Sequence, residues 1–118
     1  MSDIAQQIEQ QIASRPVVLF MKGTRDFPQC GFSSGVAQAL GHLNVDFLDV
    51  NVLESDVMRQ GIKDFSNWPT IPQIYVKGEF IGGFDIFKEM YETGELFTLF
   101  EGKGVEFTRP DPSNSAQA

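Results

Sequence analysis

The chain has 118 residues, of which 42% are hydrophobic, and its 16 acidic and 9 basic side chains give a formal net charge of −7. This acidic balance argues against a nucleic-acid-binding or anionic-membrane surface, because both need clustered lysine and arginine. The single cysteine, Cys30, excludes an internal disulfide, and the longest apolar runs are far shorter than the ~20 residues of a membrane span. A chain of this length predicts one compact domain. Because the acidic N-terminal segment lacks a signal-peptide core, we expect that domain to lie in the reducing cytoplasm.

The first half of the chain predicts a helix, a buried strand, a second helix and a second strand. Isoleucines recur at helical spacing over residues 4–12, and Pro16 ends that helix. The run VVLFM at 17–21 is continuously apolar, as in a strand covered on both faces. A helix over 33–41 and a strand over 45–50 follow, which implies a parallel strand pair with a right-handed crossover.

The second half predicts further helices and a β-hairpin. In chain order these are a helix over 56–65 capped by Ser55, a hairpin turn at Lys77-Gly78, and helices over 86–93 and 96–100. This order of elements indicates an α/β fold with a mixed sheet. We expect the domain to span residues 1–104 and residues 105–118 to form a disordered tail, because the last segment is rich in Pro, Ser and Asn.

The segment FPQCGFSS places Cys30 between the first strand and the second helix. Free backbone N–H groups and the positive end of the helix dipole favour a thiolate there, so Cys30 is a candidate nucleophile or metal ligand. The alternative for a lone cysteine is a small buried hydrophobe. The neighbours Pro28, Gly31 and Ser33 favour the reactive role, because they are typical of an exposed turn followed by a helix start.

Two further segments carry groups that suit an anionic ligand or a peptide backbone. Arg59 and Lys63 lie one helical turn apart, and Lys22 follows the first strand, where it is equally consistent with an ordinary surface lysine. Ile71 precedes Pro72 at the start of a strand. A cis bond there would turn the Ile71 N–H and C=O outward, whereas the more common trans bond would mark only the strand start.

The turn GGFD at 82–85 presents the backbone N–H groups of Phe84 and Asp85 at a helix start, which suits a carboxylate. The alternative role for Asp85 is that of a helix cap. We interpret Trp68 as a packing residue.

Together, the segments MKGTRDFPQCGFSS and RQGIKDFSNWPTIPQIYVKGEFIGGFD resemble the monothiol glutaredoxins of the CGFS class. The resemblance covers roughly residues 3–103 and includes the long loop between Lys22 and Cys30, which distinguishes this class from the dithiol glutaredoxins. It implies a thioredoxin-like fold with a central four-stranded mixed sheet flanked by helices. Two positions depart from the family: Phe84, where many members have cysteine, and Ser34, where a basic residue is common.

By this resemblance, Cys30 is the active thiol and the ligand of a 2Fe-2S cluster. The implied glutathione contacts are the backbone of Ile71, the cations Lys22, Arg59 and Lys63 at its carboxylates, and Phe84 and Asp85 at its γ-glutamyl end. A 2Fe-2S cluster usually takes four thiolate ligands, so two chains and two glutathiones would complete the set in a symmetric homodimer.

Three functions are open at this stage. The leading one is a carrier that accepts a 2Fe-2S cluster from an iron-sulfur scaffold and delivers it to apo-proteins, as a homodimer or as a heterodimer with a BolA-like protein. The second is a glutathione-dependent thiol-disulfide oxidoreductase, for which one cysteine suffices and which the resemblance implies to be weak. The third, an interaction module with an inert thiol, would make the cations, the Ile-Pro junction and the GGFD turn coincidental.

Overall fold

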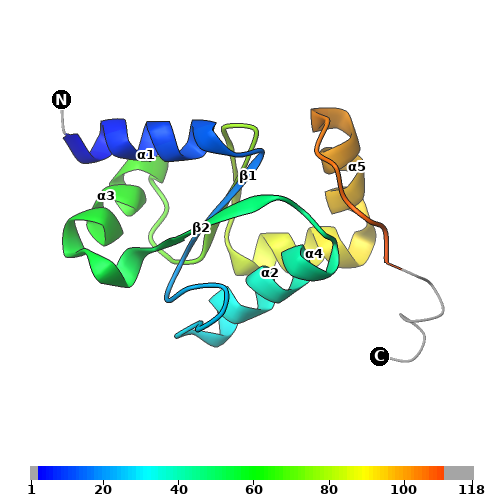
Figure 1. Ribbon diagram of the computed structural model, residues 1–118, viewed down its shortest axis with the longest axis horizontal. Helices are drawn as coiled ribbons and strands as arrows, with labels where there is room; N and C mark the ends of the chain where they lie inside the picture. The colour runs from blue at the N-terminus through cyan, green and yellow to red at the C-terminus, as the bar shows by residue number, and fades with distance from the viewer. Residues whose placement is uncertain (1–2, 111–118) are drawn as a thin grey trace.

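The computed structural model describes residues 3–110, which form a four-stranded sheet with helices on both of its faces (Figure 1). The elements are α1 (Asp3–Ser14), β1 (Val17–Met21), α2 (Gly31–His42), β2 (Phe47–Asn51), the short 3-10 helix η1 (Val52–Glu54), α3 (Asp56–Ser66), β3 (Gln73–Val76), β4 (Glu79–Gly82), α4 (Phe84–Thr93) and α5 (Glu95–Lys103). No helix within residues 3–110 has the length and apolar content needed to cross a bilayer.

The sheet has the strand order β2-β1-β3-β4, with β1 and β2 parallel and the other two pairs antiparallel. The predicted mixed sheet, the parallel crossover through α2 and the terminal hairpin are therefore confirmed. Lys77 and Gly78 form the hairpin turn with φ angles of 50° and 84°. Two left-handed residues match the twist of the flanking strands, and glycine adopts this conformation without steric cost.

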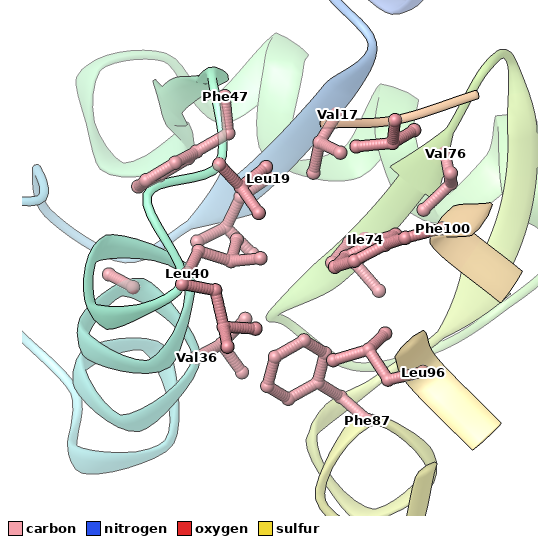
Figure 2. Close-up of a cluster of buried hydrophobic side chains, with 14 of the residues drawn as sticks. Val17, Leu19, Val36, Leu40, Phe47, Ile74, Val76, Phe87, Leu96 and Phe100 are labelled. Atoms are coloured by element: carbon pink, nitrogen blue, oxygen red, sulfur yellow. The ribbon is translucent and has the colours of Figure 1, made fainter. Parts of the chain in front are cut away.

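The central strand β1 is buried on both faces, as its unbroken apolar run predicts. Val17, Leu19 and Met21 pack with α2, α4 and α5 in one core, part of which Figure 2 shows. Val18 and Phe20 face the opposite way and pack with α1 and α3. Each fully buried side chain of this size stabilises the fold by about 1.5–3 kcal/mol. The end of β1 is therefore a rigid point from which the following residues are placed.

The helix starts differ from the predictions in detail. Ser55 caps α3 as expected, and its hydroxyl accepts a 3.1 Å hydrogen bond from the Met58 N–H. The role of Asp85 as a cap of α4 is wrong, because Gly83 is the N-cap and Asp85 lies inside the first turn. The Gly83 carbonyl accepts the Phe87 N–H at 3.0 Å, so the helix begins before Asp85.

The prediction of a disordered tail from residue 105 is wrong for residues 105–108, which pack on the domain. Val105 is buried, and the rings of Phe97 and Phe107 stack with their centroids 5.6 Å apart. The Thr108 N–H also donates a 2.7 Å hydrogen bond to the Leu43 carbonyl. Two apolar side chains in an otherwise polar segment are enough to cover the edge of the core. Residues 111–118 lie outside the described residues.

The loop between β1 and Cys30 is anchored to the edge strand β2 through Arg25. The Arg25 backbone N–H donates to Asp49 Oδ2 at 2.9 Å, its Nε donates to Asp49 Oδ1 at 3.2 Å, and its guanidinium lies 3.8 Å from the Phe47 ring centroid. Burial alone would raise the pKa of Asp49, but the Arg25 backbone N–H and guanidinium outweigh it and hold that pKa below its ordinary value. The Asp49 carboxylate thus ties the long loop to the sheet.

We predict that Asp49→Asn lowers the free energy of unfolding by about 1 kcal/mol at pH 7, the upper range for a partly exposed ion pair. Because the folded-state pKa is depressed, the stabilisation is present above the unfolded-state pKa of about 4 and is lost as the pH falls through the folded-state value. Urea unfolding of the wild type and the variant at a series of pH values measures the difference.

Asp46→Asn is the matched control, because Asp46 pairs with Arg15 at 3.0 Å while its side chain is 69% exposed. It should change stability little at any pH. A difference between Asp49→Asn and the wild type that stays constant down to acidic pH would contradict the assigned role of the Asp49 charge.

Candidate functional site

A cavity of about 460 Å³ opens beside Cys30 where the end of β1, the starts of α2 and α4, and the loop before β3 meet. Its lining contains most of the residues singled out from the sequence, namely Lys22, Cys30, Lys63, Ile71, Phe84 and Asp85. Arg59 is the exception. Its guanidinium pairs with Asp56 at 3.2 Å on the surface of α3, and it is absent from the cavity lining.

Cys30 is the N-cap residue of α2, with extended backbone angles of φ −151° and ψ 134°. The Ser33 backbone N–H lowers the pKa of the Cys30 thiol; partial burial opposes this shift, while the Phe32 N–H, the Ser33 hydroxyl and the Lys22 charge lower the pKa further. The helix start therefore favours the thiolate, as expected from its position.

Ser33 joins the strand and the helix that flank the thiol. Its side chain is fully buried, and its hydroxyl accepts a 3.1 Å hydrogen bond from the Lys22 backbone N–H. The sequence analysis used Ser33 only as a sign of a helix start. Its place three residues after the N-cap also indicated a contact with the cap residue, because side chains of the first turn reach back towards the cap.

The loop before β3 is held by one buried amide. Gln73 is fully buried, and its Nε2 donates to the carbonyls of Trp68 and Thr70 at 3.1 and 3.2 Å. The Ile71–Pro72 bond is cis, the first of the two forms considered from the sequence. Among the described residues, neither the N–H nor the C=O of Ile71 has a hydrogen-bond partner. This backbone is available to an extended ligand.

Several cavity residues were missed by the sequence analysis. Trp68 packs on Phe80, with ring centroids 5.8 Å apart, and so has the packing role predicted for it, but it also lines the cavity. Phe32 and Thr70 line it as well. Their positions in the motifs CGFS and WPT were the available signal, although a pattern of letters does not show which side of a turn a side chain takes.

The charges of the cavity are uneven. Lys22 and Lys63 line it, and neither forms an ion pair within 4 Å of an acidic group among residues 3–110. Asp85 lies at the first turn of α4, where the unpaired N–H groups of a helix start also face outward. A ligand with both carboxylate and amino groups would find partners of opposite charge in this cavity.

We predict that Ser33→Ala raises the pKa of Cys30 towards the ordinary cysteine value, because the variant removes a hydroxyl that favours the thiolate. In the wild type the thiolate should persist to a pH below that of an unperturbed cysteine. The rate of alkylation by iodoacetamide, measured against pH, gives the titration midpoint.

Ser34→Ala is the control, because the Ser34 hydroxyl accepts from Gln38 Nε2 at 2.8 Å on the helix surface. It should leave the midpoint unchanged. The same midpoint in Ser33→Ala and the wild type would contradict the role given to the Ser33 side chain.

Comparison with known proteins gives concordant matches. The glutaredoxin family model matches residues 17–81. The chain is 61% identical to the chloroplastic monothiol glutaredoxin-S14 of Arabidopsis thaliana over 75% of its own length and 51% of that protein, about half of which it therefore spans. It is 54% identical to the mitochondrial monothiol glutaredoxin-5 of Lachancea kluyveri, over 85% of this chain and 72% of that one.

The solution structure of reduced poplar apo GrxS14 superposes with a TM-score of 0.74 and 52% identity, covering 83% of this chain and 90% of the poplar chain. The predicted thioredoxin-like fold is thereby confirmed. The single cysteine of this chain agrees with the description of these relatives as monothiol glutaredoxins. The chain belongs to the glutaredoxin family, as its sequence motifs predicted.

Proposed function

We propose that this glutaredoxin binds a 2Fe-2S cluster with glutathione and transfers it to other proteins. The observation that carries the proposal is a single partly exposed cysteine, Cys30, whose pKa is lowered at a cavity that has free cations and free backbone groups. In a symmetric cluster-bridged dimer each protomer would supply one such sulfur, and two protomers would supply two of the usual four ligands.

The donor set supports an arrangement in which most cluster ligands come from elsewhere. Within residues 3–110, no three His, Cys, Asp or Glu side chains gather closely enough to hold a metal ion. Cys30 is therefore the one thiolate that each chain would bring, and a second chain and two glutathiones would complete the usual four ligands. A cluster held partly by glutathione suits delivery to other proteins, because the glutathione ligands exchange readily.

The cavity suits glutathione in shape and in charge. An extended tripeptide could hydrogen-bond along the free backbone of Ile71 while its thiol lies beside Cys30. Its carboxylates would meet Lys22 and Lys63, and its γ-glutamyl end would meet the start of α4 at Phe84 and Asp85. The ion pair of Arg59 with Asp56 indicates a smaller contribution from that arginine than from the two lysines.

The lowered pKa of Cys30 also supports thiol-disulfide exchange as a second function. In this cycle the Cys30 thiolate attacks the glutathione sulfur of a protein–glutathione disulfide and releases the protein thiolate. A second glutathione thiolate then attacks the Cys30–glutathione bond, which frees Cys30 and yields glutathione disulfide. One cysteine is sufficient for both functions. The homodimer, a BolA-like partner, the scaffold and recipient proteins and the cytoplasmic location stay predictions.

We predict that Cys30→Ser abolishes cluster binding and leaves the fold intact, because it removes the one thiolate and is nearly isosteric at a partly exposed site. Anaerobic reconstitution with iron, sulfide and glutathione, followed by absorption, iron and sulfide content and analytical ultracentrifugation, tests this. The wild type should be a monomer without the cluster and a dimer with it.

Normal absorption and stoichiometry in Cys30→Ser would refute the assignment of the ligand. A wild type that fails to load but reduces protein–glutathione disulfides would favour the second function instead. Thermal unfolding of both proteins shows whether the variant is folded.

We predict that Lys22→Gln combined with Lys63→Gln raises the glutathione concentration needed for half-maximal cluster assembly, because two carboxylate partners are lost. High salt should weaken assembly of the wild type in the same direction, since partly exposed charges are screened. Arg59→Gln is the matched comparison and should have the smaller effect. A larger effect of Arg59→Gln would show that the ligand carboxylates lie on α3 outside the cavity.

A further inference from the structure

Two phenylalanine rings form one wall of the cavity beside Cys30. Phe32 comes from the first turn of α2 and Phe84 is the first residue of α4, and both line the same cavity as Cys30. Their ring centroids are 4.9 Å apart with an interplanar angle of 42°. Lys22 and Lys63 line the same cavity. The thiolate thus shares its cavity with a pair of apolar rings and with two cations.

The Phe84 ring is held in place by the backbone of α2. A β-carbon at Gly35 would lie 3.2 Å from Cε1 of Phe84, closer than such contacts normally are. The ring can approach α2 this closely because residue 35 has no side chain. Phe84 also packs against the core between α2 and α4. Phe32, by contrast, is 58% exposed and gains its support from Phe84.

We propose that the Phe32–Phe84 pair shields the Cys30 sulfur from water and small solutes, and so slows the loss of whatever is bound to that sulfur. Two packed aromatic rings present a large apolar surface that forms no hydrogen bonds with water. The rings are also not easily displaced, since the Phe84 ring packs closely against α2. That the bound group is an iron-sulfur cluster rests on the proposed function. The shielding of the Cys30 sulfur does not, because it can be measured on the free thiol.

The first test measures access to the thiol without any cargo. The rate of alkylation by iodoacetamide is followed at a pH where every variant is fully thiolate, so that differences in pKa do not enter. Phe32→Ala and Phe84→Ala should each raise this limiting rate several-fold, and Phe84→Leu should lie between Phe84→Ala and the wild type. Phe32→Ala keeps the test decisive if Phe84→Ala folds poorly, because Phe32 is exposed.

Phe27→Ala is the matched control. Phe27 is also close to Cys30 in sequence and is 75% exposed, but it does not line the cavity. Its loss should leave the limiting rate at the wild-type value. Equal rates in the wild type, Phe32→Ala and Phe84→Leu would overturn the proposed shield, and so would an equal increase in Phe27→Ala.

The second test uses protein reconstituted with iron, sulfide and glutathione and follows the loss of visible absorption after an iron chelator is added. Loss should be several-fold faster in Phe32→Ala and Phe84→Leu than in the wild type and Phe27→Ala. Unchanged loss in variants that alkylate faster would overturn the link between shielding and retention. A wild type that never loads the cluster would refute the proposed function, while the alkylation rates would still decide the shield.

Discussion

The hydrogen bond from the Lys22 backbone N–H to the buried Ser33 hydroxyl is the contact on which the arrangement of the site depends. It connects the end of the most buried strand to the first turn of α2, so the helix start that activates Cys30 has a definite position relative to the sheet. The same serine contributes two of the hydrogen bonds that lower the pKa of Cys30. Position and reactivity of the thiol therefore have a common origin.

Two further segments next to the thiol are held by contacts of their own. The buried Gln73 amide holds the loop that carries Trp68 and Thr70, because it donates hydrogen bonds to the carbonyls of both residues. The Arg25–Asp49 pair holds the long loop before Cys30 to the edge strand. The thiol lies where these three anchored segments meet, and none of them needs a ligand in order to form. A preformed cavity of this kind loses little entropy when it binds a flexible tripeptide.

The cavity combines two kinds of surface that match its proposed cargo. Its cations and free backbone suit a carboxylate-bearing peptide, while the Phe32–Phe84 pair limits the approach of water. Because one chain offers a single thiol, binding of a cluster would have to recruit ligands from outside the polypeptide. Affinity and release would then depend on glutathione concentration and on the second protomer, both of which can vary without any change in the fold.

Local features were predictable from the sequence by itself, because local hydrogen bonding and side-chain periodicity determine them. The buried strand at 17–21, the Ser55 cap, the Lys77-Gly78 turn and the strand-to-helix junction at Cys30 are all of this kind, although the helix begins at Gly31 and not at Ser33 as predicted. The tertiary structure decided which side chains meet. Arg59 and Lys63 are neighbours on one helix, yet only Lys63 lines the cavity, because the packing of Met58 and Ile62 fixes the rotation of α3. Phe32 faces Phe84, and Phe107 stacks on Phe97, across distances in sequence that no short pattern spans.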